Sequence, residues 1–319
     1  MLNVGGGIET EATITRLDHD RFYVVANIFA EGRLADLFDQ QRRPGESFKV
    51  TNLSRELGVL VVAGPLSRSV MEKLSKHDFS NTAFPFFTAA PLPDISANCL
   101  AIRASFTGEL AWELHLPHEE MKNVYERLMD AGAPFGIKPF GSLAMNSLRI
   151  EKSYRTAAEL TPNLSMVEVD MLRFVSFEKG DFVGRAATEA IRKAGTEDVL
   201  VTLQIDATDA DCSGGEPVFA PTGQLVGSVS SGDYGHHVKA SLALAFVKRS
   251  NSLPGAELLV DILGERRRAT VLSGPAYDPE NRRLRGNGTD RGSILNADQD
   301  SFTSNDSGSE RDMMKVAGS

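Results

Sequence analysis

The sequence predicts an α+β protein built in two parts and followed by a tail. Helical and strand patterns alternate over residues 1–197, whereas residues 198–286 contain only short strand patterns separated by Gly, Pro, Asn and Asp. Residues 287–319 are rich in Ser, Asp, Asn and Gly and contain one aromatic residue, which is too little apolar surface to form a core. We therefore expect a mixed α/β region, a separate all-β domain and a disordered tail.

Composition and charge narrow the classes of function. The chain has 319 residues, and its 43 acidic and 34 basic side chains give a net charge of −9, which offers a nucleic acid no electrostatic attraction. No apolar run is long enough to cross a bilayer, so we expect a cytoplasmic protein without membrane association. The two cysteines and six histidines have no metal-ligand spacing, which predicts that the chain holds no metal.

The opening stretch MLNVGGGIETEATITRL poses a choice between a phosphate-binding loop and a β-hairpin. A phosphate loop needs glycines that lead into a helix N-terminus, but β-branched residues follow the glycines here and favour a strand. Residues 18–20 supply a turn, and residues 21–29 form a second strand pattern. We predict a glycine turn into a β-hairpin with Glu9 and Glu11 on one side of its first strand. From these residues alone, that acidic side is either solvated or functional.

Apolar residues at helical spacing predict the helices of the first part, and runs of β-branched residues predict its strands. The predicted helices cover residues 30–41, 65–74, 118–133, 139–154 and 180–195. The third of them carries an apolar stripe made of Met121, Val124, Tyr125 and Leu128. The predicted strands cover residues 48–54, 58–65, 99–106 and 111–117, with a hairpin turn at residues 107–109.

Residues 198–286 have the pattern of short strands, with no helical periodicity between them. Five stretches carry this pattern: VLVTLQI, GEPVFA, GQLVGSVSS, SLALAFV and AELLVDILGERRRATVLS. Turn residues separate them at short intervals, which is typical of a β-barrel or a β-sandwich. The pattern leaves these two architectures open.

Several long motifs, in unchanged order, resemble a known family. They are VTNLSRELGVLVVAGPLSR, RASFTGELAWELHLP, FGSLAMNSLRIEKSYR, FEKGDFVGRAA and GQLVGSVSSGDYGHHVKASLALAFV. Together they resemble the folate-dependent module shared by glycine-cleavage aminomethyltransferase and the C-terminal half of dimethylglycine and sarcosine dehydrogenases. The strings SRELGVLVVAGP, FTGELAWEL and SLALAFV resemble the dimethylglycine dehydrogenase branch most closely.

The resemblance implies a fold and an activity. Members of this family bind tetrahydrofolate in the central opening of cloverleaf-like α/β lobes that are followed by a C-terminal β-barrel. They move a one-carbon unit from an amine to the folate. We therefore expect tetrahydrofolate as the cofactor and a small methylated amine, such as dimethylglycine or sarcosine, as the substrate, with methylene-tetrahydrofolate as the product.

Glu11 is the catalytic residue that the resemblance implies. In the glycine-cleavage branch the glycine hairpin continues into a pair of aspartates, and the second of them, the key acid, falls on Glu11 when the strand is placed without gaps. Transfer joins a folate nitrogen to an iminium-like carbon, so a carboxylate beside that centre stabilises positive charge and accepts a proton. Glutamate keeps the charge of aspartate but adds a methylene, and the alternative interpretation is a surface carboxylate.

Five further residues are implied as the folate pocket. Tyr23 and Val25 fall on strand positions that line the pocket in the family, and Glu168 falls on the glutamate that holds the pterin ring. A carboxylate suits the pterin because the ring presents an amine and an N–H side by side. Tyr154 and Tyr234 are wall residues in this interpretation, although buried tyrosines often only pack.

Three departures from the family pattern weaken this assignment. Family members carry an α/β segment ahead of the glycine hairpin, where this chain begins, and an arginine used in folate binding where Val199 stands. The Pro and Gly that flank the pterin glutamate are Met166 and Asp170 here. We interpret the chain as a gene fragment, a chain with a misplaced start, or a weakened homologue.

The alternative functions are a redox-neutral folate-dependent demethylase and a non-catalytic folate-binding accessory protein or remnant. The accessory branch carries a cysteine directly after the Lys-Gly of its signature, whereas Asp181 follows Lys179 and Gly180 here. No Gly-x-Gly-x-x-Gly lies between a predicted strand and a helix, so we expect no flavin on this chain. If it acts in amine oxidation, a separate flavoprotein dehydrogenase is its expected partner.

Overall fold

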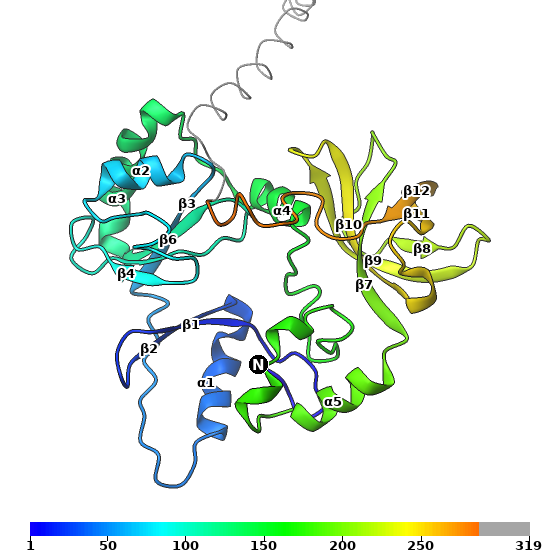
Figure 1. Cartoon of the computed structure of the whole chain (residues 1–319), viewed down its shortest axis with the longest axis horizontal. Coiled ribbons are helices and arrows are strands. Elements are labelled where there is room, and N and C mark those ends of the chain that lie inside the picture. Colours follow the sequence, from blue (N-terminus) through cyan, green and yellow to red (C-terminus); the bar gives the residue numbers. More distant parts are fainter. Residues whose placement is uncertain (287–319) are drawn as a thin grey trace, which may run out of the picture.

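The computed structural model describes residues 1–286, and their elements form three groups around a common centre (Figure 1). A β-hairpin forms one group with α1 (Glu31–Gln40) and α5 (Arg185–Ala194). A four-stranded sheet with two helices forms the second group, and a closed β-barrel forms the third. The helix α4 (Ser142–Glu151) lies between the sheet and the barrel. The predicted cloverleaf-like α+β fold with a C-terminal barrel is confirmed.

The opening glycines lead into a β-hairpin, as predicted. β1 (Ala12–Arg16) pairs antiparallel with β2 (Phe22–Ala26). A Cβ atom on Gly7 would lie 1.9 Å from the backbone oxygen of Pro162, so only glycine lets the chain pass this close to that loop. Gly7 therefore lets the start of the chain pack against a distant segment, and the glycines are followed by a strand instead of a helix.

The four-stranded antiparallel sheet has the strand order β3-β6-β5-β4 and is covered on one face by α2 and α3. Tyr125 was predicted on the apolar stripe of α3 but is 41% exposed. Val124 and Leu128 are buried, and Tyr125 is rotated by about 100° from Val124 around the helix, away from the sheet. The bounds are β3 (Leu57–Ala63), α2 (Ser67–Leu74), β4 (Ala89–Pro91), β5 (Leu100–Ile102), β6 (Ala111–Pro117) and α3 (His118–Gly132).

The barrel closes with the strand order β10-β7-β12-β11-β8-β9, which decides between the two architectures that the sequence pattern left open. Its core is filled by small and branched apolar side chains such as Leu203, Val218 and Val260. Leu263 and Gly264 both have positive φ and form the tight turn between the last two strands. The bounds are β7 (Asp198–Ile205), β8 (Pro217–Phe219), β9 (Leu225–Gly235), β10 (Ala240–Lys248), β11 (Glu257–Ile262) and β12 (Glu265–Val271).

The helix α4 fixes the backbone that follows it. The buried guanidinium of Arg149 donates hydrogen bonds to the Ser231 hydroxyl and to the Tyr154 backbone oxygen, both at 3.1 Å. Ser153 then adopts φ 55°, which ends the helix and turns the chain. Residues 152–155 are thereby held between the sheet and the barrel.

Residues 48–54 were predicted as a strand and do not form one. Their β-branched and aromatic residues favour a strand, but no strand of the described chain pairs with them. Instead the Arg42 guanidinium lies over the Phe48 ring, with its Cζ atom 3.9 Å from the centre of the ring. Strand propensity without a pairing partner does not produce a strand.

The predicted tail, residues 287–319, lies outside the described residues. Among residues 1–286, no helix combines the length and the apolar character required to span a membrane.

Candidate functional site

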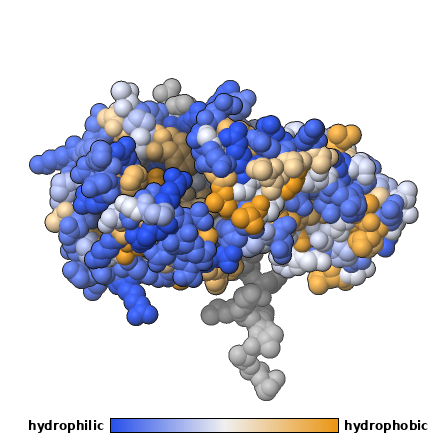
Figure 2. Space-filling model, turned by 90° about the horizontal axis from the view of Figure 1, so that it is seen from below, coloured by the Kyte–Doolittle hydropathy of each residue, from blue (hydrophilic) through white to orange (hydrophobic). Residues whose placement is uncertain are grey.

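A large cavity lies where the three groups of elements meet. Its volume is about 1550 Å³, above the usual range for small-molecule sites, and it opens to solvent. The face in Figure 2 is hollowed, and apolar side chains are visible inside the hollow. The wall is drawn from the hairpin, the sheet, the segment after α4, the barrel and the chain that follows the barrel.

Glu11 lies on the wall of this cavity, directly before β1. The residue keeps contact with solvent, and partial burial of its carboxyl group raises the pKa. Glu9 does not share this position, because its side chain is buried in an ion pair with Arg33. Both glutamates were predicted on the first strand, but that strand begins only at Ala12, and only Glu11 of the two lines the cavity.

Val25 and Tyr154 also line the cavity, as expected for pocket residues. Val25 lies on β2 opposite Thr13, which lines the cavity as well. The Tyr154 ring stacks on the Phe106 ring, with ring centres 6.0 Å apart and planes at 25°, and burial raises the pKa of the tyrosine. Phe106 belongs to the same wall, so the two rings form an aromatic surface inside the cavity.

Tyr23 lies outside the cavity wall and holds the hairpin onto the sheet. Its hydroxyl is 3.0 Å from Nδ1 of His115, a buried residue of β6. The other ring nitrogen of His115 is 3.3 Å from the Glu113 carboxylate, and Glu113 lines the cavity. Burial raises the pKa of Tyr23. The structure therefore gives Tyr23 a supporting position behind a second cavity carboxylate.

Glu168 also lies outside the cavity wall, although Met166 and Asp170 on either side of it line the cavity. One carboxylate oxygen of Glu168 accepts hydrogen bonds from the backbone N–H and the hydroxyl of Ser165, both at 2.7 Å. Its backbone oxygen accepts the Leu200 N–H at 2.7 Å and so ties this turn to the barrel. A pterin at this position would compete with Ser165 for the carboxylate.

Tyr234 is the third predicted pocket residue that does not line the cavity. It lies on β9, and its backbone oxygen accepts a hydrogen bond from the Ser147 hydroxyl of α4 at 2.6 Å. Its ring packs edge-on against His236. Tyr234 therefore joins the barrel to α4. Val199, which stands where the family carries an arginine, does line the cavity.

Cationic side chains on the cavity wall were not found by sequence reasoning. Arg155, Arg173 and Lys179 all line the cavity. The Arg155 guanidinium is held by the backbone oxygens of Ser153 and Val169, at 2.8 and 3.1 Å. These three residues are separated in the sequence, and no local pattern indicates that they share a cavity.

Comparison with known protein families and structures agrees with this geometry. Residues 1–179 match the GCVT N-terminal domain, and residues 199–278 match the glycine cleavage T-protein C-terminal barrel domain. The crystal structure of glycine cleavage system aminomethyltransferase T from Bartonella henselae has the same fold, with a TM-score of 0.77 and 23% identity. That match covers 88% of this chain and 75% of the other.

Two curated relatives differ in how much of their own length the match covers. Dimethylglycine dehydrogenase, mitochondrial, of Mus musculus is 34% identical over 290 residues, which cover 89% of this chain and 33% of the relative. The probable aminomethyltransferase of Thermococcus gammatolerans is 26% identical over 308 residues, which cover 88% of this chain and 76% of the relative. The chain thus spans about a third of the dehydrogenase that it matches. The resemblance described from the sequence motifs is confirmed.

Proposed function

Because the chain belongs to the glycine cleavage T-protein family, we propose that it binds tetrahydrofolate in the central cavity and transfers a one-carbon unit to it from a methylated amine. The proposed donor is dimethylglycine or sarcosine, and the proposed product is methylene-tetrahydrofolate. One observation carries the proposal: Glu11, the residue at the family's acid position, lies on the wall of a cavity that all three groups of elements build.

Glu11 has the properties that this transfer requires of a protein group. When bound, tetrahydrofolate supplies the amine nitrogen that receives the carbon. The Glu11 carboxylate stabilises the positive charge beside that nitrogen and accepts the proton that leaves it. Partial burial raises the pKa of Glu11, which makes its carboxylate a stronger base than that of a solvated glutamate.

The cavity wall also fits the rest of the cofactor. Tyr154 and Phe106 offer aromatic faces to the flat rings of a folate. Arg155, Arg173 and Lys179 offer cations to its glutamyl carboxylates. We propose that these cations replace the arginine that the family carries at the position of Val199. Glu168 is proposed to hold the pterin after one of its oxygens is released from Ser165.

The oxidation of the amine is proposed to take place on a separate flavoprotein dehydrogenase. The relatives named dimethylglycine and sarcosine dehydrogenase share with this chain only about a third of their length. The iminium carbon would then reach this cavity from outside the matched region. The residues of this chain therefore act only in the step that transfers the carbon to tetrahydrofolate.

The proposal is tested with Glu11→Gln, which preserves the size of the side chain and removes its charge. The assay follows methylene-tetrahydrofolate formation from dimethylglycine in the presence of a flavoprotein dehydrogenase. We expect the rate to fall by about 10²-fold or more while the dissociation constant of tetrahydrofolate changes little.

The matched control is Glu257→Gln, which removes an exposed glutamate on the barrel strand β11 and should change neither quantity. Equal rates for the wild type and Glu11→Gln would remove Glu11 from the mechanism. A wild type that binds tetrahydrofolate without any transfer would identify the chain as a folate-binding protein instead of an enzyme.

A further inference from the structure

The segment that follows the barrel makes contacts with the other parts of the molecule. Residues 274–286, which we call the strap, leave the barrel after β12, pass α4 and reach the sheet (orange in Figure 1). The Tyr277 N–H donates to the backbone oxygen of Glu151 at 2.9 Å, and the Arg285 backbone oxygen accepts a hydrogen bond from the Arg103 guanidinium at 2.8 Å. The strap therefore connects the barrel, α4 and the sheet.

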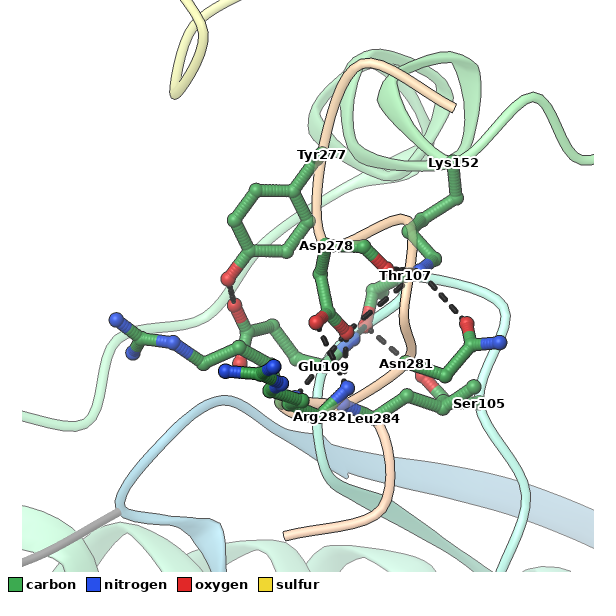
Figure 3. Close-up of polar contacts among 10 residues, drawn as sticks. Ser105, Thr107, Glu109, Lys152, Tyr277, Asp278, Asn281, Arg282 and Leu284 are labelled. Carbon is green, nitrogen blue, oxygen red and sulfur yellow. Dashed lines mark hydrogen bonds and ion pairs between the residues drawn. The ribbon is translucent and has the colours of Figure 1, made fainter. Parts of the chain in front are cut away.

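Lys152 is the central contact between the strap and the rest of the molecule (Figure 3). Its side chain is 1% exposed. The ammonium donates hydrogen bonds to the backbone oxygen of Asp278 at 2.6 Å and to Oδ1 of Asn281 at 2.9 Å, and it lies 3.6 Å from the Asp278 carboxylate. A buried ammonium is retained in the interior only when its donors are paired, and here the strap provides each of these acceptors.

The aliphatic part of Lys152 packs against the turn that precedes β6. A Cβ atom on Gly108 would lie 2.1 Å from Cγ of Lys152, and Gly108 itself has φ 80°, so this turn accepts only glycine. Residue 108 belongs to the turn before β6. Lys152, directly after α4, thus contacts the turn before β6 with its aliphatic chain and the strap with its ammonium group.

The strap is folded locally so that it presents these acceptors. The Asp278 carboxylate accepts the backbone N–H groups of Arg282, Arg283 and Leu284 at 2.8 to 3.2 Å. Asp278 and Asn281 have φ values of 43° and 58°, in a region that Asp and Asn tolerate better than most residues. The backbone is therefore bent around the point where Lys152 enters.

A second contact lies beside the first. The Tyr277 hydroxyl donates a hydrogen bond to the Glu109 carboxylate, and the Tyr277 ring packs edge-on against the His237 ring of the barrel. Burial raises the pKa of Glu109. This contact fixes the start of the strap between the turn before β6 and the barrel.

The strap is also part of the cavity wall. Pro275, Pro279, Asn281 and Leu284 line the cavity, as does Lys152 itself. Tyr154 and Arg155, which the proposed function assigns to the folate, are separated from Lys152 in the chain only by Ser153.

We propose that Lys152 is a positioning residue for tetrahydrofolate, because it holds the strap in place as a wall of the cavity. This proposal rests on the proposed function for the identity of the ligand, but the anchoring of the strap is independent of it. Without the ammonium, the Asp278 backbone oxygen and the Asn281 side chain lose its hydrogen bonds. The strap then keeps only the backbone hydrogen bond from Tyr277 to Glu151 at this end of α4. The wall that faces the ligand then opens.

The test uses Lys152→Met, which keeps the stem against Gly108 and removes the charge. Hydrogen exchange is measured by mass spectrometry on peptides that cover the strap and, as an internal reference, on peptides that cover β7. We expect exchange in the strap to become about tenfold faster while β7 is unchanged, and the dissociation constant of tetrahydrofolate to rise by about tenfold. In the wild type, saturating tetrahydrofolate should slow exchange in the strap, because coupling between ligand and wall is reciprocal.

Lys248→Met is the matched control. Lys248 is paired with Glu197 and Asp198 at 2.9 and 3.0 Å on the barrel surface, so its removal breaks an ion pair away from the strap. It should change neither strap exchange nor folate affinity. If Lys152→Met does not fold, Asn281→Gly removes one acceptor at a positive φ that glycine adopts freely, and both effects should be about threefold.

Unchanged strap exchange in Lys152→Met would overturn the anchoring. Faster strap exchange with an unchanged dissociation constant would overturn the positioning of the ligand. A wild type without affinity for tetrahydrofolate would refute the proposed function and the positioning together, and the exchange data would still decide whether Lys152 anchors the strap.

Discussion

At the residue scale, the proposed transfer depends on the charge of Glu11, and we therefore expect the reaction rate to be sensitive to pH. Partial burial raises the pKa of this carboxyl above its ordinary value, so it takes up a proton at a higher pH than a solvated glutamate does. Only the ionised form stabilises the positive charge and accepts the proton. As the pH falls, transfer should therefore be lost earlier than an ordinary glutamate would predict.

The measurement is the pH profile of kcat/KM for methylene-tetrahydrofolate formation. We expect an acidic limb whose apparent pKa lies above the ordinary glutamate value in the wild type. Glu11→Asp should keep an acidic limb, and Glu11→Gln should lose it together with most of the rate. A limb that persists in Glu11→Gln would assign the titration to another group and contradict the role of Glu11.

The carboxylate of Glu168 differs from that of Glu11 because it already accepts hydrogen bonds from Ser165. If Glu168 holds the pterin, Glu168→Gln should weaken tetrahydrofolate binding by about 1–3 kcal/mol, since a charged acceptor pair becomes a mixture of donor and acceptor. Ser165→Ala removes the competing hydroxyl and should leave the affinity equal or higher. Calorimetric titrations of the three proteins decide the matter, and equal affinity in the wild type and Glu168→Gln would contradict this role.

At the element scale, the hairpin must be held against the sheet for Glu11 and Val25 to form one wall. The Tyr23 hydroxyl provides part of this attachment through the buried His115. Tyr23→Phe leaves a buried ring nitrogen without its partner, so we expect a loss of about 1–3 kcal/mol in the free energy of unfolding. Denaturant titration measures this loss.

The same variant separates a supporting role from a contact with folate. Because Tyr23 lies outside the cavity wall, Tyr23→Phe should change the dissociation constant of tetrahydrofolate by less than about twofold. Tyr154→Phe is the comparison, since Tyr154 does line the cavity. A large loss of affinity in Tyr23→Phe with unchanged stability would restore Tyr23 to the pocket.

Helices and strands with a clear hydrophobic periodicity could be predicted from the sequence, but the pairing partners of the strands could not. The strand at residues 111–117 and the helix at residues 185–194 follow from local alternation and helical spacing. Residues 48–54 carry the same strand signal and fail because no strand pairs with them. Strand formation depends on a neighbour that local sequence does not identify.

The candidate site likewise contains residues that the sequence predicts and contacts that it does not predict. The family motifs predict Glu11, Val25 and Tyr154 as site residues, and all three line the cavity. The motifs do not reveal that Lys152 reaches Asp278, because the two residues are 126 positions apart and no local pattern joins them. Glu168 and Tyr234 have backbone hydrogen bonds to other elements that likewise depend on the whole fold.

At the scale of the whole molecule, the proposed function places tetrahydrofolate in the central cavity. All three groups of elements and the strap contribute to its wall, so the cavity exists only in the assembled chain. Val25 lies on that wall, and a large ring at this position would occupy the space of the ligand. Leu225, an exposed residue at the start of β9, offers a position for the same substitution outside the wall.

The most direct test is therefore a calorimetric titration of tetrahydrofolate into the wild type, Val25→Trp and Leu225→Trp. We expect one binding site in the wild type, an unchanged dissociation constant in Leu225→Trp, and a dissociation constant at least about tenfold higher in Val25→Trp. Equal affinity in all three proteins would place the folate outside the central cavity, and a wild type that does not bind tetrahydrofolate would refute the proposed function.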